Sequence, residues 1–196
     1  MSQERAARTR RALIAAAAAE FARNGYAGTS LARVCASAGV TMGALTFHFP
    51  SKRALAAAVV SRGADLTAEA LRPVTTRPSA GLGAAVELTV VLARLLEEDV
   101  VARAAARLGQ EREDTGTNGW RAAWMPQART LLANANANAA GDAGEYGDPA
   151  GLELLVLYLV AGAEAAVRAG WRDGSVEEQV RHLWELLLSD FGSRAR

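Results

Sequence analysis

Apolar side chains return every three to four residues along almost the whole chain, and no stretch alternates apolar and polar residues as a strand does. With 196 residues the chain is long enough to bury a core. The spacing predicts an all-α protein of about nine helices. The predicted helices cover about 8–23, 31–38, 41–47, 51–71, 84–97, 100–108, 120–138, 151–169 and 175–191, with polar linkers over 75–83, 109–119 and 141–149.

The segment that follows the first predicted helix has the pattern of a helix-turn-helix. Gly25 ends the first helix because glycine readily takes a positive φ, and Thr29 or Ser30 caps the second helix. Gly39 stops the second helix, and the third begins at Thr41. Two short helices joined by so brief a turn are typical of the helix-turn-helix motif.

The charge of the chain is unevenly distributed. Residues 1–62 hold nine basic and two acidic side chains, a net charge of +7, whereas the remainder carries −6. A basic N-terminal part on an acidic body is the layout of a protein that binds nucleic acid at one end, although a merely solvated basic terminus would look the same. We expect residues 1–53 to form a DNA-binding domain, linked by the helix from residue 51 to a helical domain over 54–196.

The third predicted helix leaves apolar side chains without a place in the core. The buried positions around it would be Leu31, Val34, Ala38, Val40, Leu45, Phe49 and Leu55. The outer positions would then be Met42, Gly43, Thr46, Phe47 and His48. Insertion into a major groove explains an outward Phe47, because its ring can contact thymine methyl groups. Thr41 offers its hydroxyl and the first-turn N–H groups to a phosphate, and Lys52, the only lysine, would point at the same backbone.

The residues from Ile14 to Leu55 resemble the DNA-binding head of the TetR repressor family without a gap. The matching positions are Ile14, Ala17, Phe21, Gly25, Thr29, Leu31, Ala38, Gly39, Val40, Thr41, Gly43, Leu45, His48, Phe49, Lys52 and Leu55. The pattern GAL-x-FHF over 43–49 is similar to the gamma-butyrolactone (autoregulator) receptor branch of that family. Weaker likenesses continue over 94–108, at the tryptophans of the seventh helix and over 176–191.

The resemblance implies a homodimeric repressor that binds double-stranded operator DNA. The candidate DNA-binding residues are Arg8, Arg10, Thr29, Ser30, Arg33, Thr41, Met42, Gly43, Thr46, Phe47, His48 and Lys52. His48 would contact a phosphate or support a residue that does, although a half-buried structural histidine is the alternative. The family usually has tyrosine where this chain has Thr46, and that tyrosine reaches a phosphate. Threonine is shorter, so its contact would pass through water, and either DNA affinity would be lower or the operator would be unusual.

The resemblance also implies a small-molecule effector in the C-terminal domain, where a tryptophan of the branch covers the bound lactone. Trp124 fits that position better than Trp120, because Leu131 then falls on the same helical face, but both remain candidates. The candidate ligand-binding residues are Trp124, Trp120, Leu88, Leu92, Leu95, Leu131, Leu155 and Leu159. Polar groups that orient the lactone in relatives fall on Gly63 and Ala163 here, so we expect a hydrophobic effector.

The last two predicted helices carry more apolar surface than one chain can cover. A four-helix bundle formed with a second copy is the natural arrangement for such helices. The candidate dimer residues are Leu152, Val156, Val180, Leu183, Leu187 and Phe191.

Several other functions are poorly supported. The chain has no phosphate-binding glycine loop, GxSxG or HExxH motif, and one cysteine, Cys35, with two histidines supplies little for a metal. We therefore expect no enzyme activity, no cofactor and no metal. The run over 12–19 and the uncharged run over 154–163 are too short for a membrane span, which points to a cytoplasmic protein. The alternative is a helical small-molecule-binding protein or enzyme that has lost DNA binding.

Overall fold

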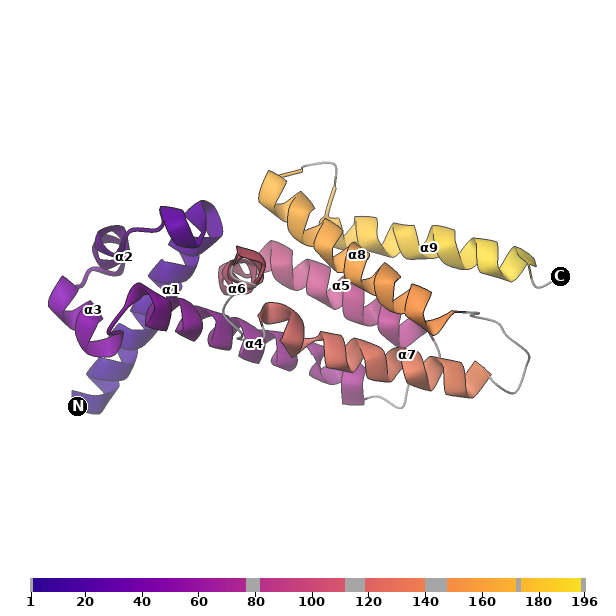
Figure 1. Ribbon diagram of the computed structural model, residues 1–196, viewed down its shortest axis with the longest axis horizontal. Helices are drawn as coiled ribbons and strands as arrows, with labels where there is room; N and C mark the ends of the chain where they lie inside the picture. Colours follow the sequence, from indigo (N-terminus) through magenta and orange to yellow (C-terminus); the bar gives the residue numbers. More distant parts are fainter. Residues whose placement is uncertain (1, 77–81, 112–118, 140–147, 172–173, 195–196) are drawn as a thin grey trace. The chain divides into compact units, whose positions relative to one another are not determined.

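The computed structural model describes residues 2–76, 82–111, 119–139, 148–171 and 174–194 (Figure 1). These residues form nine α-helices and one short 3-10 helix, with no strand among them, which confirms the predicted all-α fold. The elements are α1 (Ser2–Gly28), α2 (Leu31–Ala38), α3 (Met42–His48), α4 (Lys52–Thr76), α5 (Gly83–Glu98), α6 (Val100–Glu111), the 3-10 helix η2 (Trp120–Ala123), α7 (Met125–Ala139), α8 (Pro149–Ala169) and α9 (Val176–Arg194). The predicted linkers lie mostly outside the described residues.

The helices divide into two compact units, each made of two stretches of chain. Unit 1 holds Met1–Leu66 and Asp99–Ala123, and unit 2 holds Thr67–Glu98 and Trp124–Arg196. The predicted boundary after residue 53 differs from this division, because α6 packs along α1 and so joins the N-terminal helices.

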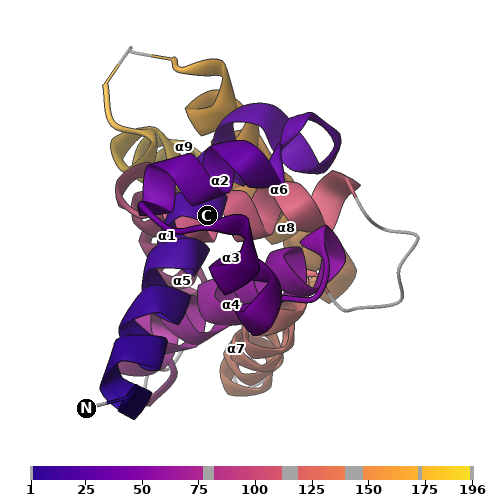
Figure 2. The same ribbon diagram turned by 90° about the vertical axis from the view of Figure 1, so that its left-hand side faces the viewer.

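Unit 1 is built around the apolar face of α1, against which α2 and α6 pack (Figure 2). Its core includes Leu13, Ala17, Phe21, Val34, Cys35, Leu45, Phe49, Leu55, Val59 and Leu108. The helical spacing of these residues brings α1, α2, α3 and the start of α4 into one core, as predicted.

The first helix is longer than predicted at both ends, and Gly25 divides it. The backbone at Gly25 has φ 68° and ψ −178°, so the helix is interrupted where the sequence predicts its end. This combination of angles is almost confined to glycine. The chain then makes one further turn, Tyr26 to Gly28, before α2.

Helix α4 continues past the predicted end at Leu71, with Pro73 inside it. Proline offers no N–H to the helix. The hydroxyl groups of Thr75 and Thr76 donate to the carbonyl oxygens of Leu71 and Arg72, and Val74 is buried. These contacts hold the last turn in place.

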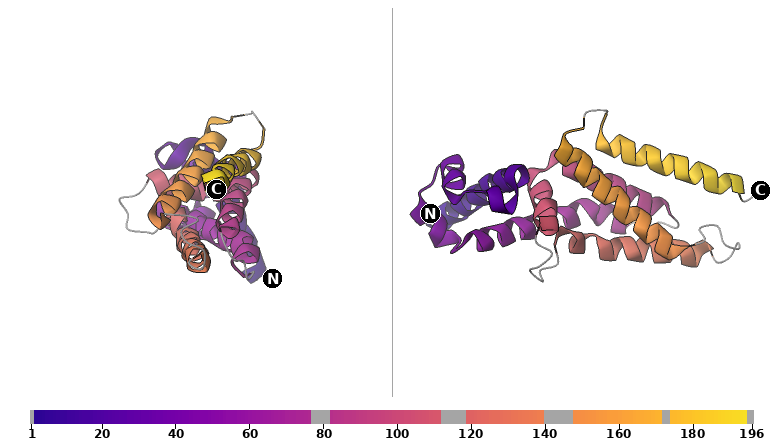
Figure 3. Two further views of the ribbon diagram at one scale, coloured as in Figure 1. Left: turned by 90° about the vertical axis from the view of Figure 1, so that its right-hand side faces the viewer. Right: turned by 45° about the horizontal axis from the view of Figure 1, so that its top comes forward.

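Unit 2 contains α5, α7, α8 and α9, which run along one another (Figures 1 and 3). Thr89 of α5 and Trp184 of α9 are both buried, and the indole N–H donates to the threonine oxygen at 2.8 Å. Helix α8 is long and apolar enough to cross a membrane by length and composition alone, with 28% of its most apolar window buried. A core helix of a soluble protein has the same properties, so α8 is weak support for a membrane span.

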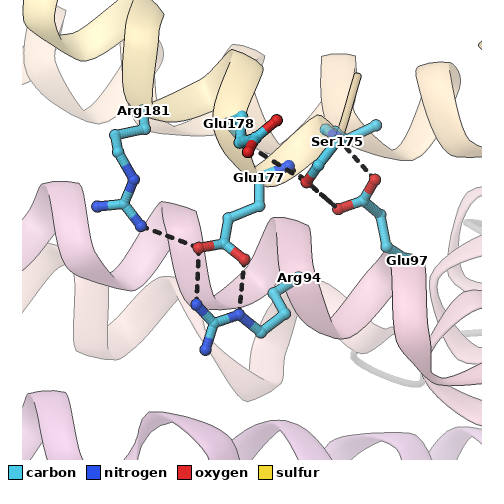
Figure 4. A network of polar contacts seen from close by, with 7 residues as sticks. Arg94, Glu97, Ser175, Glu177, Glu178 and Arg181 are labelled. Carbon is cyan, nitrogen blue, oxygen red and sulfur yellow. Dashed lines mark hydrogen bonds and ion pairs between the residues drawn. The ribbon is translucent and has the colours of Figure 1, made fainter. Parts of the chain in front are cut away.

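The start of α9 is capped by a residue of another helix (Figure 4). The Glu97 carboxylate accepts the Ser175 hydroxyl at 2.8 Å and the Val176 N–H at 2.6 Å. Ser175 and Glu178 have the spacing of a capping box, but the contact from the Glu178 N–H to the Ser175 oxygen is long, at 3.5 Å. The carboxylate replaces it because an anion at a helix N-terminus satisfies free N–H groups and opposes the dipole.

Next to this cap, Glu177 joins α9 to α5 through a bidentate ion pair (Figure 4). Its carboxylate accepts Nε and Nη2 of Arg94 at 2.6 and 2.7 Å and also pairs with Arg181. The hydrogen bond from Arg94 holds the pKa of Glu177 below its ordinary value. These contacts fix the start of α9 on the end of α5.

Three of the predicted dimer residues belong to the core of the chain itself. Leu152, Val156 and Val180 are 5%, 0% and 3% exposed, so they offer little surface to a second copy. Leu183 is exposed and Leu187 half-buried, whereas the Phe191 side chain lies outside the described residues. The exposed large apolar side chains on these two helices are Leu154 and Tyr158 of α8 and Leu183 and Leu186 of α9.

Candidate nucleic-acid interface

The turn between α2 and α3 has the tight geometry that the sequence predicts. Gly39 lies in the left-handed region, with φ 66° and ψ 34°. Its N–H and that of Val40 donate to carbonyl oxygens at the end of α2, so the chain reverses without losing hydrogen bonds. Thr41 then caps α3, where its hydroxyl oxygen accepts the Ala44 N–H at 3.2 Å.

Helix α3 has one face in the core and one face in solvent. Leu45 is fully buried and Phe49, just after the helix, is 3% exposed. Met42 is 44% exposed and Phe47 is 82% exposed, the largest value among the exposed large apolar side chains of the described residues. The His48 ring meets the Phe47 ring edge to face, with centroids 5.2 Å apart. Burying these outward groups needs a partner, because exposing a large ring to water is unfavourable.

Three cations of unit 1 are each held by another part of the chain. The Arg10 guanidinium lies 5.2 Å from the Phe49 ring centroid. Lys52 donates to the Ala27 carbonyl oxygen at 3.3 Å, and Arg33 pairs with Glu20 at 3.0 Å. These contacts restrict the three long side chains before any ligand binds.

Most predicted DNA-binding residues lie at the surface of unit 1. Exposed are Arg8, Arg10, Ser30, Arg33, Thr41, Met42, Gly43, Thr46 and Phe47, and half-buried are His48 and Lys52. Thr29 differs, because it is 5% exposed and its hydroxyl donates to the Gly25 carbonyl oxygen at 2.7 Å. Ser30 is the N-cap residue of α2, but its side chain makes no capping hydrogen bond. The Thr46 hydroxyl donates to Gly43 of its own helix.

The predicted ligand-binding residues fall in both units. Trp124, Leu88, Leu92 and Leu131 are buried in unit 2, where Leu95, Leu155 and Leu159 are half-buried. Trp120 is buried in unit 1, on the 3-10 helix that packs against α6.

One buried polar group of unit 2 was not predicted from the sequence. The side-chain oxygen of Gln127 on α7 is buried without a hydrogen-bond partner. Gln127 follows Trp124 by three residues, which is one helical turn. A glutamine between apolar neighbours was the available signal, but glutamine is so common on helix surfaces that periodicity does not single it out.

Comparisons with known proteins agree with this geometry. The family described as bacterial regulatory proteins, tetR family, matches residues 13–59. No curated protein sequence matches the chain significantly. Among solved structures, the TetR regulator TylP from Streptomyces fradiae is 31% identical, with a TM-score of 0.62, and the match covers 93% of this chain and 86% of that one.

Two further solved structures are similar over nearly the whole chain. CprB, a TetR family protein from Streptomyces coelicolor A3(2), is 28% identical, with a TM-score of 0.76 and coverage of 95% of this chain and 89% of that one. An ArpA-like gamma-butyrolactone receptor is 26% identical, with a TM-score of 0.73 and coverage of 94% and 88%. These solved structures are described as a receptor, a TetR family protein and a TetR regulator. The chain belongs to the TetR family of bacterial regulatory proteins, and its architecture is similar to that of a gamma-butyrolactone receptor and of other TetR regulators.

Proposed function

We propose that the protein is a cytoplasmic transcriptional repressor that binds a palindromic operator as a homodimer and leaves it when a small hydrophobic effector binds. The observation that carries the DNA-binding part is Phe47, which is 82% exposed on a helix whose opposite face, at Leu45, is fully buried. The surrounding residues 1–62 carry a net charge of +7, which favours a polyanionic partner.

On DNA, α3 would lie in the major groove. Met42 and Phe47 would contact thymine methyl groups and so carry sequence preference, whereas Thr41 and Lys52 would bind phosphates and carry general affinity. CprB, 28% identical to this chain, has been solved in complex with its biological operator sequence, which supports the same use of this head.

Dimerisation would use the exposed apolar side chains of α8 and α9, not the buried residues that the sequence pattern pointed to. Leu154 and Tyr158 are four residues apart, and Leu183 and Leu186 three apart, so each pair shares one face of its helix. Two copies of these faces would form a four-helix bundle and place two heads on one palindrome.

The effector would bind among α5, α7 and α8, which pack on one another in unit 2. Trp124, Leu88, Leu92 and Leu131 would supply apolar contact, and the buried oxygen of Gln127 would accept a hydrogen bond from a donor group of the effector. Similar solved structures are described as gamma-butyrolactone receptors, which supports a lactone-like compound. Release of DNA requires that the effector bind more tightly to the form that does not fit the operator.

Selection of duplexes from random DNA tests the DNA-binding part. The wild-type protein is expected to enrich a palindrome and to bind it with an affinity that falls steeply with salt. Failure to enrich any sequence would contradict the proposal.

Tryptophan substitution tests the effector part, with a synthetic gamma-butyrolactone as the probe. We expect Trp124→Ala to abolish quenching of tryptophan fluorescence and release of DNA, whereas Trp120→Ala, a matched change in unit 1, retains DNA release. Equal release from both variants would show that neither tryptophan belongs to the site.

A further inference from the structure

Glu111, the last residue of α6, reaches the break in α1. Its Oε2 accepts the peptide N–H of Tyr26 at 2.6 Å, although 85 residues separate the two. Arg107, one turn earlier on α6, donates to Glu111 Oε1 at 2.7 Å and to the Ala22 carbonyl oxygen at 3.0 Å. The Arg107–Glu111 pair therefore holds the chain before and after the break.

Gly25 makes this approach possible. Its backbone angles, φ 68° and ψ −178°, are almost confined to glycine. A Cβ at this position would collide with the carboxylate of Glu111 and would lie 2.8 Å from Nη2 of Arg107. Gly25 thus allows α1 to bend here and leaves the space that the Arg107 and Glu111 side chains occupy.

The same turn, residues 25–28, also holds two cations proposed to face DNA. Lys52 Nζ donates to the Ala27 carbonyl oxygen and lies 4.7 Å from the Tyr26 ring centroid. Arg33 Nη2 donates to the Gly28 carbonyl oxygen at 2.7 Å. Three elements therefore bind this one turn of backbone: α6 through Glu111, α4 through Lys52 and α2 through Arg33.

We propose that the Arg107–Glu111 pair is a positioning device for DNA binding, which fixes the turn 25–28 and through it Lys52 and Arg33. The pair does not touch DNA, and the proposal rests on the proposed function of unit 1 as a DNA-binding head. An ion pair this close to solvent contributes little to folding. Its loss is expected to act on the DNA complex instead.

The sign of the effect separates positioning from simple electrostatics. Glu111→Ala removes a negative charge from the basic unit, which by itself strengthens binding to DNA. A positioning role predicts weaker binding, because Lys52 loses its fixed place at the phosphate. Glu153→Ala is the matched control, since Glu153 pairs with Arg129 at 2.6 Å in unit 2 and the charge change is identical.

The experiment measures fluorescence anisotropy of a duplex of about 30 base pairs, selected by the wild type from random DNA and long enough for two half-sites. For Glu111→Ala we expect roughly tenfold weaker binding and a plot of log affinity against log salt whose slope is smaller by about two, because each of the two heads on the duplex loses one phosphate contact. Glu153→Ala is expected to bind as the wild type does, or slightly more tightly. Binding by Glu111→Ala as tight as that of Glu153→Ala would overturn the proposal.

Glu111→Gln is the second variant, and it tests the positioning role of the ion pair if Glu111→Ala does not fold. Its amide oxygen can still accept the Tyr26 N–H, but the charge that holds Arg107 is gone. We expect affinity between wild type and Glu111→Ala, with an unchanged unfolding temperature. Wild-type affinity for Glu111→Gln in the absence of a folded Glu111→Ala would overturn the proposal.

Hydrogen exchange of the free full-length protein separates this proposal from the proposed function. The Tyr26 amide is expected to exchange faster in Glu111→Ala than in the wild type, while the Leu45 amide is unchanged. If the wild type selects no duplex, the proposed function fails, and unchanged Tyr26 exchange would independently show that the pair does not fix the turn. Faster exchange with unchanged DNA affinity would show a purely structural contact and overturn the positioning role.

Discussion

Both units expose large apolar side chains, but in different surroundings. In unit 1 Met42 and Phe47 stand on a helix of seven residues. In unit 2 Leu154, Tyr158, Leu183 and Leu186 lie on helices of 21 and 19 residues. Residues 1–62 carry a net charge of +7, whereas residues 63–196 carry −6.

An exposed apolar side chain does not by itself identify its partner, whereas the charge and the helix length around it do. A single ring on a short helix among cations fits a groove lined by phosphates. Pairs of apolar residues at helical spacing on two long helices fit two further helices. Exposed apolar side chains therefore favour DNA as the partner of unit 1 and a second copy of the chain as the partner of unit 2.

The largest expected effect comes from charging the apolar face of unit 2. Leu183→Lys with Leu186→Lys should dissociate the dimer, because paired lysines would be buried in the interface. Operator affinity should then fall by about 100-fold or more, since one head alone loses the gain from double attachment. Sedimentation velocity and anisotropy check both results.

Trp171→Lys is the control for this change, since Trp171 is 65% exposed outside α8 and α9. Added lysines favour DNA binding electrostatically, so a loss of affinity would have to come from dissociation. A double variant that remains a dimer would show that a different surface joins the copies.

The matching change in unit 1 is Phe47→Ala. We expect the preference for the selected operator over a single-base variant to fall by about 1–3 kcal/mol, while the unfolding temperature stays the same because the ring is in solvent. Competition binding measures the preference, with Trp171→Ala as the control for loss of an exposed ring. Unchanged preference would mean that α3 does not present this face to the bases.

A smaller and more uniform effect is expected from Lys52→Ala. Selected and random duplexes should weaken alike, and the slope of log affinity against log salt should be smaller by about two, one lost phosphate contact for each head of the dimer. Arg62→Ala is the control, because it removes the same charge from an exposed position farther along α4. If the two variants had the same salt slope, Lys52 would contribute only its charge and would not contact a phosphate.

The smallest effect is expected from Thr46→Tyr. The Thr46 hydroxyl donates to Gly43 of its own helix at 3.1 Å, so it is turned away from a distant phosphate. A tyrosine would extend from this exposed position, and one added hydrogen bond should tighten binding by about threefold with less selectivity. Weaker binding of every duplex would indicate a clash between the ring and the DNA.

The fold and the faces of α3 could be predicted because their determinants are local. The turn depends on Gly39, which ends α2 in the left-handed conformation. The faces of α3 depend on the positions of Leu45 and Phe47, which helical periodicity places on different sides. The buried position of Thr29 was not predictable in the same way, since a threonine at a helix start is typical of both a cap and a core contact.

The contacts that join distant helices could not be read from the sequence. Glu111 falls in a predicted linker and Glu97 looks like a solvated charge at the end of its helix, and only the folded chain brings them to Tyr26 and Val176. Three of the predicted dimer residues, Leu152, Val156 and Val180, are buried in the chain itself for a related reason. The apolar stripe of α9 is wide enough for two partners, and periodicity does not tell which half, such as Val180 or Leu183, meets the chain's own core.

The most direct test of the account is the stoichiometry and salt dependence of wild-type binding to its selected duplex. Sedimentation of the complex should give two chains per palindrome, and a duplex with one half-site should bind far more weakly. Affinity should fall by a factor of about 1,000 or more between 50 and 200 mM salt if six or more phosphates are contacted. A salt-insensitive complex, or one chain per duplex bound as tightly as the palindrome, would contradict the account.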